Sequence, residues 1–167
     1  MTKLHLGCGK QYKKGWINVD FDRNLKTDVY HDLTIFPYPF KNGEASEILA
    51  SHIIEHLTAK ERMEFLKECH RLLGFEGKLI IETPIAYTWA AAHLNHTDGG
   101  GFTPWSFKIF QQAEWDFEFP KFKVLNMRIF MPFLWRKPKI SFPWQFIYFN
   151  CFINNIFTKM HVELVKL

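Results

Sequence analysis

Residues 4–9 read Leu-His-Leu-Gly-Cys-Gly, and residues 16–20 read Trp-Ile-Asn-Val-Asp. The first stretch predicts a short apolar strand that runs into two glycines, and the second predicts a strand that ends on a carboxylate. Gly7 and Gly9 allow a sharp turn and a close approach to a ligand, because a Cβ atom would block both. Asp20 stands where a carboxylate can accept hydrogen bonds from two ribose hydroxyls. Together these parts predict a pocket for a nucleoside-containing cofactor.

Further strands and helices alternate along the chain. Strands are predicted over 27–32, 47–50, 78–83, 121–130 and 161–167, and helices over 58–73 and 104–113. Thr58 and Glu61 have the spacing of a helix capping box, and Gly74 stands where a C-terminal glycine belongs. Strands that alternate with helices predict an α/β fold with a mainly parallel sheet.

The composition suits a single domain spanning residues 1–167 that buries a proper core. The net charge is +4 and the basic residues are scattered, so charge does not argue for a nucleic-acid partner. The three cysteines are odd in number and lack close spacing, which speaks against a disulfide framework and indicates the cytoplasm. No signal peptide is expected, because the first charged residues lead directly into a strand. The sequence assigns no oligomeric state.

The motifs, in this order, resemble the class I S-adenosylmethionine-dependent methyltransferases, and in particular a small branch found beside sugar-modifying enzymes. The resemblance covers the first hundred residues. It rests on the glycine turn and the strand-end acid, on His31-Asp32-Leu33 with the Pro-rich loop 36–40, on Ser-His-Ile-Ile-Glu-His-Leu at 51–57, and on the helix, glycine turn and strand of 72–81.

This resemblance implies a Rossmann-like, mainly parallel sheet of about seven strands, with the last strand antiparallel and helices on both faces. S-adenosylmethionine would lie across the carboxyl ends of the first strands, where open α/β sheets bind ligands. The residues expected to hold the cofactor are Gly7, Cys8, Gly9, Asp20, Asp32 and His52.

Two positions depart from the family pattern. The family often carries an acid two residues before the first glycine, and here that residue is His5. The connection from Gly9 to Trp16 is too short for a crossover helix, whose N-terminal amides would meet the cofactor's carboxylate. We therefore expect Lys10, Lys13 or Lys14 to supply part of that anion site.

Methyl transfer to a hydroxyl needs alignment of the reactants and is helped by a general base, for which histidine suits neutral pH. The expected acceptor is a small molecule or a saccharide, methylated at oxygen. His96 lies in a glycine-rich loop after a strand and is the preferred base, with His52 as the second candidate. If 51–57 is helical, His52 and His56 share a face; His56 is expected to pack and cap the helix, whereas His52 is open to either role.

Two other classes of function have sequence support. His52, Glu55 and His56 match the spacing of inverted zinc proteases, with Glu114 or Glu118 as a third ligand, but the segment falls at a methyltransferase motif and no metal is expected. The aromatic segment 132–158 has no charged residue from 140 on, but its polar residues argue against a membrane span. It is expected to be an insertion that packs on the sheet and lines the acceptor pocket. The alternative is a degenerate module that binds a partner or a membrane surface.

Overall fold

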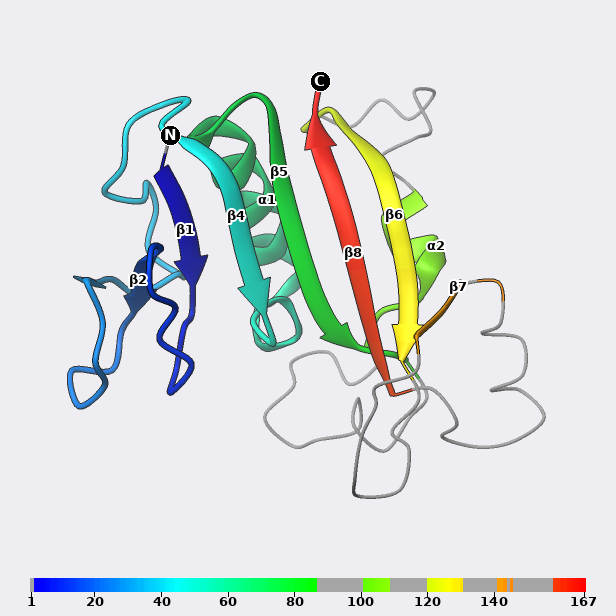
Figure 1. Ribbon diagram of the computed structural model, residues 1–167, viewed down its shortest axis with the longest axis horizontal. Coiled ribbons are helices and arrows are strands. Elements are labelled where there is room, and N and C mark those ends of the chain that lie inside the picture. The colour runs from blue at the N-terminus through cyan, green and yellow to red at the C-terminus, as the bar shows by residue number, and fades with distance from the viewer. Residues whose placement is uncertain (1, 87–100, 109–119, 131–140, 144, 146–157) are drawn as a thin grey trace.

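The computed structural model describes residues 2–86, 101–108, 120–130, 141–143, 145 and 158–167. These residues form an eight-stranded sheet (Figure 1). The strands are β1 (Thr2–Leu6), β2 (Ile17–Asp20), β3 (Val29–Tyr30), β4 (Ala45–Ser51), β5 (Leu73–Pro84), β6 (Phe122–Phe130), β7 (Ser141–Pro143) and β8 (Lys159–Lys166). The helical segments are η1 (Ile54–His56), α1 (Ala59–Leu72) and α2 (Pro104–Lys108).

The strand order is β3-β2-β1-β4-β5-β8-β6-β7, and Figure 1 shows β8 lying between β5 and β6. The pairs among β3, β2, β1, β4 and β5 are parallel, whereas β8 is antiparallel to both of its neighbours. This arrangement confirms the predicted Rossmann-like sheet with an antiparallel last strand. The short strand β7 extends the sheet beyond β6.

The core lies between the sheet and the helices α1 and α2. Met160, Val162 and Leu164 alternate along β8 and are fully buried, as period-2 alternation predicts. Phe65 of α1 and Phe107 of α2 join the same cluster, so both helices pack on one face of the sheet. A helical layer on the opposite face, which the resemblance implies, is not among the described residues.

Helix α1 begins and ends at positions close to those predicted. Thr58 and Glu61 form the capping box, with Thr58 Oγ1 accepting from the Glu61 amide and Glu61 accepting from the Thr58 amide. The helix ends at Leu72 and β5 begins at the next residue. Gly74 does not adopt the left-handed conformation of a helix-capping glycine, and the positive φ of this turn, 58°, falls on Glu76 instead.

Several predicted strand boundaries are wrong, and the strand predicted over 78–83 begins earlier, at Leu73. The strand predicted over 27–32 ends at Tyr30, because Asp32 instead caps a turn by accepting hydrogen bonds from Thr34. Only Ile54–His56 of the segment 51–57 is helical, and His52 has a left-handed φ of 59°. His52 and His56 therefore do not share a helix face.

The connection from β1 to β2 contains no helix, as its length predicts. Asn18 holds this connection in place. Its Oδ1 accepts from the Lys13 amide at 2.8 Å, and its Nδ2 donates to the carbonyls of Lys13 and Trp16, both at 3.0 Å. Asn18 Nδ2 and its own amide also donate to the Asp28 carboxylate, which links the loop to the start of β3. One buried amide side chain thus organises the segment that a crossover helix would otherwise fill.

Candidate functional site

The turn after β1 favours glycine at two positions, because both have a left-handed backbone. Gly7 and Gly9 both have positive φ, at 63° and 51°, a region that L side chains rarely adopt. A Cβ atom on Gly7 would lie 1.9 Å from Cδ1 of Ile53, so the Ile53 side chain would have to shift to admit a larger residue. At Gly9 the described residues place no atom within 4 Å of the Cβ position, so the turn is open there.

Asp20 closes β2 beside this turn. The residue is 7% exposed, and its carboxylate is held by two backbone amides. Oδ2 accepts from Gly9 at 2.8 Å, and Oδ1 accepts from Asp22 at 3.1 Å. The structure therefore brings the glycine turn and the strand-end acid together, as the sequence predicts.

Asp32 lies on the next connection, after β3. Its Oδ1 accepts from the Thr34 amide at 2.9 Å and from the Thr34 hydroxyl at 2.8 Å. Among the described residues, no donor contacts its other carboxylate oxygen. Asp32 therefore retains an acceptor that is free to meet a ligand.

A cavity of about 200 Å³ opens at the carboxyl ends of β1 and β2. Its lining residues are Gly7, Asp20, Phe21, Asp32, Leu33, Thr34, Ile53, His56 and Leu57. Three of the predicted cofactor residues, Gly7, Asp20 and Asp32, meet here, whereas Cys8, Gly9 and His52 do not line the cavity. This edge of the sheet is where open α/β folds bind ligands.

Six of the lining residues lie outside the predicted cofactor set: Phe21, Leu33, Thr34, Ile53, His56 and Leu57. Phe21 is 71% exposed and directly follows Asp20, so its ring stands at the cavity rim. An aromatic residue immediately after a strand-end acid was the available signal. His56, which was expected to pack, is instead exposed and lines the cavity.

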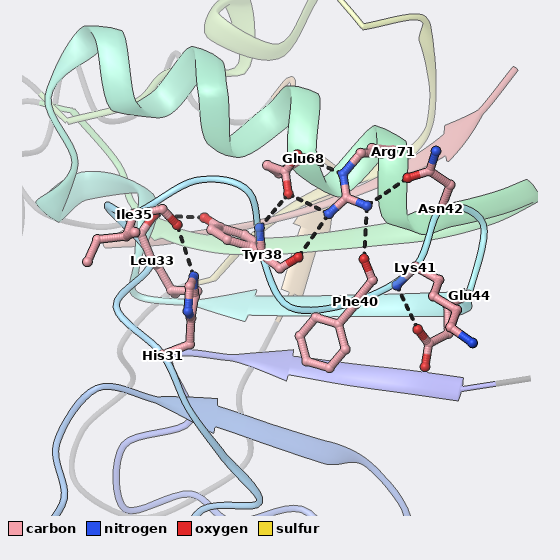
Figure 2. Close-up of polar contacts among 10 residues, drawn as sticks. All are labelled: His31, Leu33, Ile35, Tyr38, Phe40, Lys41, Asn42, Glu44, Glu68 and Arg71. Carbon is pink, nitrogen blue, oxygen red and sulfur yellow. Dashed lines mark hydrogen bonds and ion pairs between the residues drawn. The ribbon is translucent and has the colours of Figure 1, made fainter.

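A network of hydrogen bonds holds the loop that carries Asp32 (Figure 2). Arg71 of α1 donates to the carbonyls of Tyr38 and Phe40 at 3.1 and 2.9 Å, and to Asn42 Oδ1 at 2.7 Å. Glu68 pairs with Arg71 at 2.7 Å and also accepts from the Tyr38 amide at 2.8 Å. Burial would raise the pKa of Glu68, but these hydrogen bonds outweigh it and lower the pKa.

The same loop is bonded internally next to the cavity. Figure 2 shows the hydroxyl of Tyr38 directed at the Leu33 carbonyl, to which it donates at 2.8 Å. His31 Nε2 lies 2.9 Å from the Ile35 carbonyl, and the rings of His31 and Tyr38 meet edge to face. The backbone on either side of the cavity-lining residues Leu33 and Thr34 is therefore fixed by contacts within the loop, which the Tyr38 amide also ties to Glu68 of α1.

The positions that depart from the family pattern have other partners. His5 is buried, and its Nδ1 lies 3.3 Å from Asn18 Oδ1. Burial lowers the pKa of His5, so a neutral imidazole occupies the place of the family's acid. Lys13 Nζ lies 5.1 Å from the ring centroid of Trp16, which stands before β2. Lys10 and Lys14 are exposed.

A buried carboxylate holds His52 at the end of β4. The His52 amide donates to the Glu82 carbonyl at 2.8 Å, and its Nδ1 lies 3.0 Å from Glu55 Oε1. Glu55 is 1% exposed, whereas the side chain of His52 is 46% exposed. The other Glu55 oxygen accepts from Thr83 Oγ1 at 3.3 Å. Such a pair can orient an imidazole so that Nε2 faces the solvent.

A second polar cluster lies on the opposite side of the β5 terminus. Glu82 accepts from Ser51 Oγ at 2.7 Å and from Lys159 Nζ at 2.6 Å, and it lies 3.3 Å from His161 Nδ1. His161 Nε2 in turn lies 3.1 Å from Glu163. Both imidazole nitrogens of His161 thus face carboxylates, so this histidine is an ion-pair partner.

Several predictions lie outside the described residues. They concern His96 and its loop, Glu114 and Glu118, and most of the segment 132–158. Within the described residues, no group of three or more His, Cys, Asp or Glu side chains is placed to hold a metal ion. In the same part of the chain, no helix is long and apolar enough to cross a membrane.

No protein-family model matches the sequence, and no curated protein matches it. Solved structures match almost the whole chain. One is a SAM-dependent methyltransferase from Archaeoglobus fulgidus, at 17% identity and a TM-score of 0.67, over 99% of this chain and 86% of that one. Another, from Methanosarcina mazei, matches at 12% identity and a TM-score of 0.61, over 99% and 92% of the two chains.

A third structure is the 1,6-didemethyltoxoflavin-N1-methyltransferase of Burkholderia thailandensis, bound to 1,6-didemethyltoxoflavin and S-adenosylhomocysteine. It matches at 11% identity and a TM-score of 0.57, over 99% of this chain and 70% of that one. At these identities the likeness concerns the fold. The chain has the fold of the class I SAM-dependent methyltransferases.

Proposed function

We propose that this chain binds S-adenosylmethionine and transfers its methyl group to a small-molecule or saccharide acceptor, at oxygen. One observation carries the proposal. The cavity at the carboxyl ends of β1 and β2 combines the glycine turn, the acid that ends β2 and a further acid after β3, within a methyltransferase fold. The fold alone does not assign a reaction, so the argument rests on the site.

The cavity residues suit the nucleoside of the cofactor. Asp20 would accept hydrogen bonds from the ribose hydroxyls, because its carboxylate is held at the end of β2. Asp32 has an acceptor oxygen for the exocyclic amine of adenine. Phe21, Leu33 and Ile53 supply apolar surface for the flat base. It stays a prediction that the cofactor also contacts Cys8, Gly9 and His52.

The acceptor would bind beyond the cavity, at the ends of β4 and β5. S-adenosylmethionine supplies an activated methyl group, so the protein has to align the acceptor oxygen and remove its proton. His52 is proposed as the base, because Glu55 can hold the Nδ1–H form and leave Nε2 to accept the proton. His96 stays the other candidate, on a loop that would cover the acceptor.

The proposal also covers the extent of the domain, the role of the aromatic segment 132–158 and the cellular compartment. Residues 1–167 would form one domain, and the aromatic segment 132–158 would line the acceptor site. Contact of this segment with a membrane surface is the alternative role. Cys8 and Cys69 are buried free thiols, which suits the reducing cytoplasm.

Calorimetric titration with S-adenosylmethionine and S-adenosylhomocysteine tests the proposal. We expect both ligands to bind the wild-type protein. Asp20→Ala should weaken both by at least about tenfold, because it removes charged acceptors of the ribose hydroxyls. Thermal unfolding of the variant checks that it is folded.

Asp22→Ala is the matched control, because Asp22 lies two residues away, bonds Asn24 and does not line the cavity. Asp20→Asn serves if the alanine variant does not fold. Absence of binding to the wild type, or equal binding by the Asp20 and Asp22 variants, would contradict the proposed function.

A further inference from the structure

The cavity at the carboxyl ends of β1 and β2 is small for a complete cofactor. We infer that the nucleoside half supplies nearly all of the affinity for S-adenosylmethionine and S-adenosylhomocysteine, and that the α-amino acid half adds little because it lies outside the cavity. The inference rests on the proposed function, because it concerns the same site. It differs from the expectation that a lysine after Gly9 replaces the missing anion site.

The size and lining of the cavity fit a nucleoside. Its volume of about 200 Å³ lies below the roughly 300–1,000 Å³ of pockets that enclose a complete ligand. Its polar acceptors are the carboxylates of Asp20 and Asp32, and its walls include Phe21, Leu33 and Leu57. Hydroxyl donors, an amino donor and an aromatic ring suit these groups, whereas a carboxylate would meet two acids of its own charge.

The amides of the glycine turn are already engaged. The Cys8 amide donates to the Val19 carbonyl at 3.0 Å, and the Gly9 amide donates to Asp20 Oδ2 at 2.8 Å. An anion site at a turn or a helix N-terminus depends on amides directed at the ligand. Here these two amides tie the turn to β2 instead. The turn therefore positions Asp20 and does not offer them to the ligand's carboxylate.

In the loop after Gly9, the side chain of Lys13 lies away from the cavity. Asn18 fixes the backbone of Lys13 through its amide and its carbonyl. The ammonium groups of Lys13 and Lys3 lie 5.1 and 5.3 Å from the ring centroid of Trp16. Trp16 precedes β2 and Asp20 ends it, which at about 3.3 Å per residue separates their backbones by roughly 13 Å. The charge of Lys13 thus lies toward the far end of β2.

A matched pair of ligands tests the inference in the wild-type protein. S-adenosylhomocysteine and 5′-methylthioadenosine share the nucleoside and the sulfur, but only the first carries the α-amino acid. We expect calorimetric dissociation constants that differ by less than about tenfold. If the protein made one hydrogen bond to the α-carboxylate of S-adenosylhomocysteine, this ligand would bind roughly 10- to 150-fold more tightly than 5′-methylthioadenosine.

Lysine variants extend the test to the loop. Lys10→Ala and Lys14→Ala should leave the ratio of the two dissociation constants unchanged, as should the distant surface variant Lys123→Ala. Selective loss of S-adenosylhomocysteine affinity in either loop variant would overturn the inference. So would tenfold or tighter binding of S-adenosylhomocysteine to the wild type, although the proposed function would then stand. If neither ligand binds, the proposed function fails and the inference fails with it.

Discussion

Glu82 joins β4, β5 and β8 through its carboxylate. It receives hydrogen bonds from Ser51 and Lys159 and pairs with His161. The contact with His161 is the largest cause that lowers the pKa of Glu82, followed by burial in the opposite sense and by the bonds from Lys159 and Ser51. Glu82 in turn raises the pKa of His161, with a smaller contribution from Glu163.

The Glu82–His161 pair should make stability depend on pH. The raised pKa of His161 contributes stability that is complete below 6.5 and is lost as the pH rises through the folded pKa. The lowered pKa of Glu82 contributes stability that is present above 4.5 and is lost on acidification. His161→Gln should therefore cost about 1.5–3 kcal/mol near pH 6 and less near pH 9, measured by urea unfolding.

A double-mutant cycle isolates this pair. Glu82→Gln and the double variant are unfolded under the same two conditions, and the coupling energy should be larger near pH 6 than near pH 9. A cost of His161→Gln that does not change with pH would show that the imidazole acts only through packing.

Some site residues were predictable and others were not. Asp20 follows from its position at the end of an apolar strand. Asp32 lines the cavity although the strand predicted to carry it ends earlier, because its turn keeps the carboxylate at the same edge. That His56 lines the cavity and His52 does not could not be predicted from the sequence. It follows from the left-handed backbone at His52, which is set by contacts with β5.

At the scale of elements, Arg71 joins α1 to the connection between β3 and β4. Arg71→Met should lower the free energy of unfolding by about 2–4 kcal/mol, because it leaves Glu68 without its cation and removes the guanidinium donors to the Tyr38 and Phe40 carbonyls, of which the Tyr38 carbonyl keeps the Phe40 amide. Urea unfolding measures this loss. Hydrogen exchange over residues 33–42 should also become faster, because the loop loses its attachment to the helix.

Lys67→Met on the same helix is the matched control. Lys67 pairs with Glu64 at 3.1 Å, and both side chains are 41% exposed, so its loss should cost at most about 0.5 kcal/mol. Equal costs for the two variants, or unchanged exchange in Arg71→Met, would contradict the role of Arg71 as a clamp.

Periodic elements were predicted well because their signal is local. The capping box at Thr58 and the alternation along 161–167 need only neighbouring residues. The role of Arg71 could not be predicted in this way. It depends on contacts between residues about thirty positions apart, such as Arg71 with Phe40, and no local sequence pattern indicates such contacts. The same holds for Asn18, whose buried amide replaces a crossover helix.

At the scale of the whole molecule, Lys166 connects β8 to the end of α1. Its Nζ donates to the carbonyls of His70 and Leu73, both at 2.8 Å, and burial lowers its pKa. A cation at a helix C-terminus also interacts favourably with the helix dipole. Lys166→Met should lower the free energy of unfolding by about 1–3 kcal/mol, measured by urea unfolding.

Lys123→Met provides the comparison, because Lys123 is exposed on the neighbouring strand β6. It should stay within about 0.5 kcal/mol of the wild type. If Lys166→Met is equally neutral, then the two carbonyls are satisfied without the ammonium group.

The order of the strands follows from the family resemblance and from the alternation of strands and helices. The sequence alone did not indicate that β7 extends the sheet, because three residues are too few for a periodic signal. The lack of a helix between β1 and β2 was predictable from the length of the connection, because residues 10–16 are too few to form a crossover helix.

The position of β8 also bears on how the chain assembles as it leaves the ribosome. β8 follows β6 in the chain but lies between β5 and β6 in the sheet. Strands β3, β2, β1, β4 and β5 can pair as soon as β5 has been synthesised. The edge of β5 then stays open, and β6 has no place in the sheet until residues 159–166 arrive. Translation of the segment between β5 and β8 therefore sets how long an unpaired strand edge is exposed to other nascent chains.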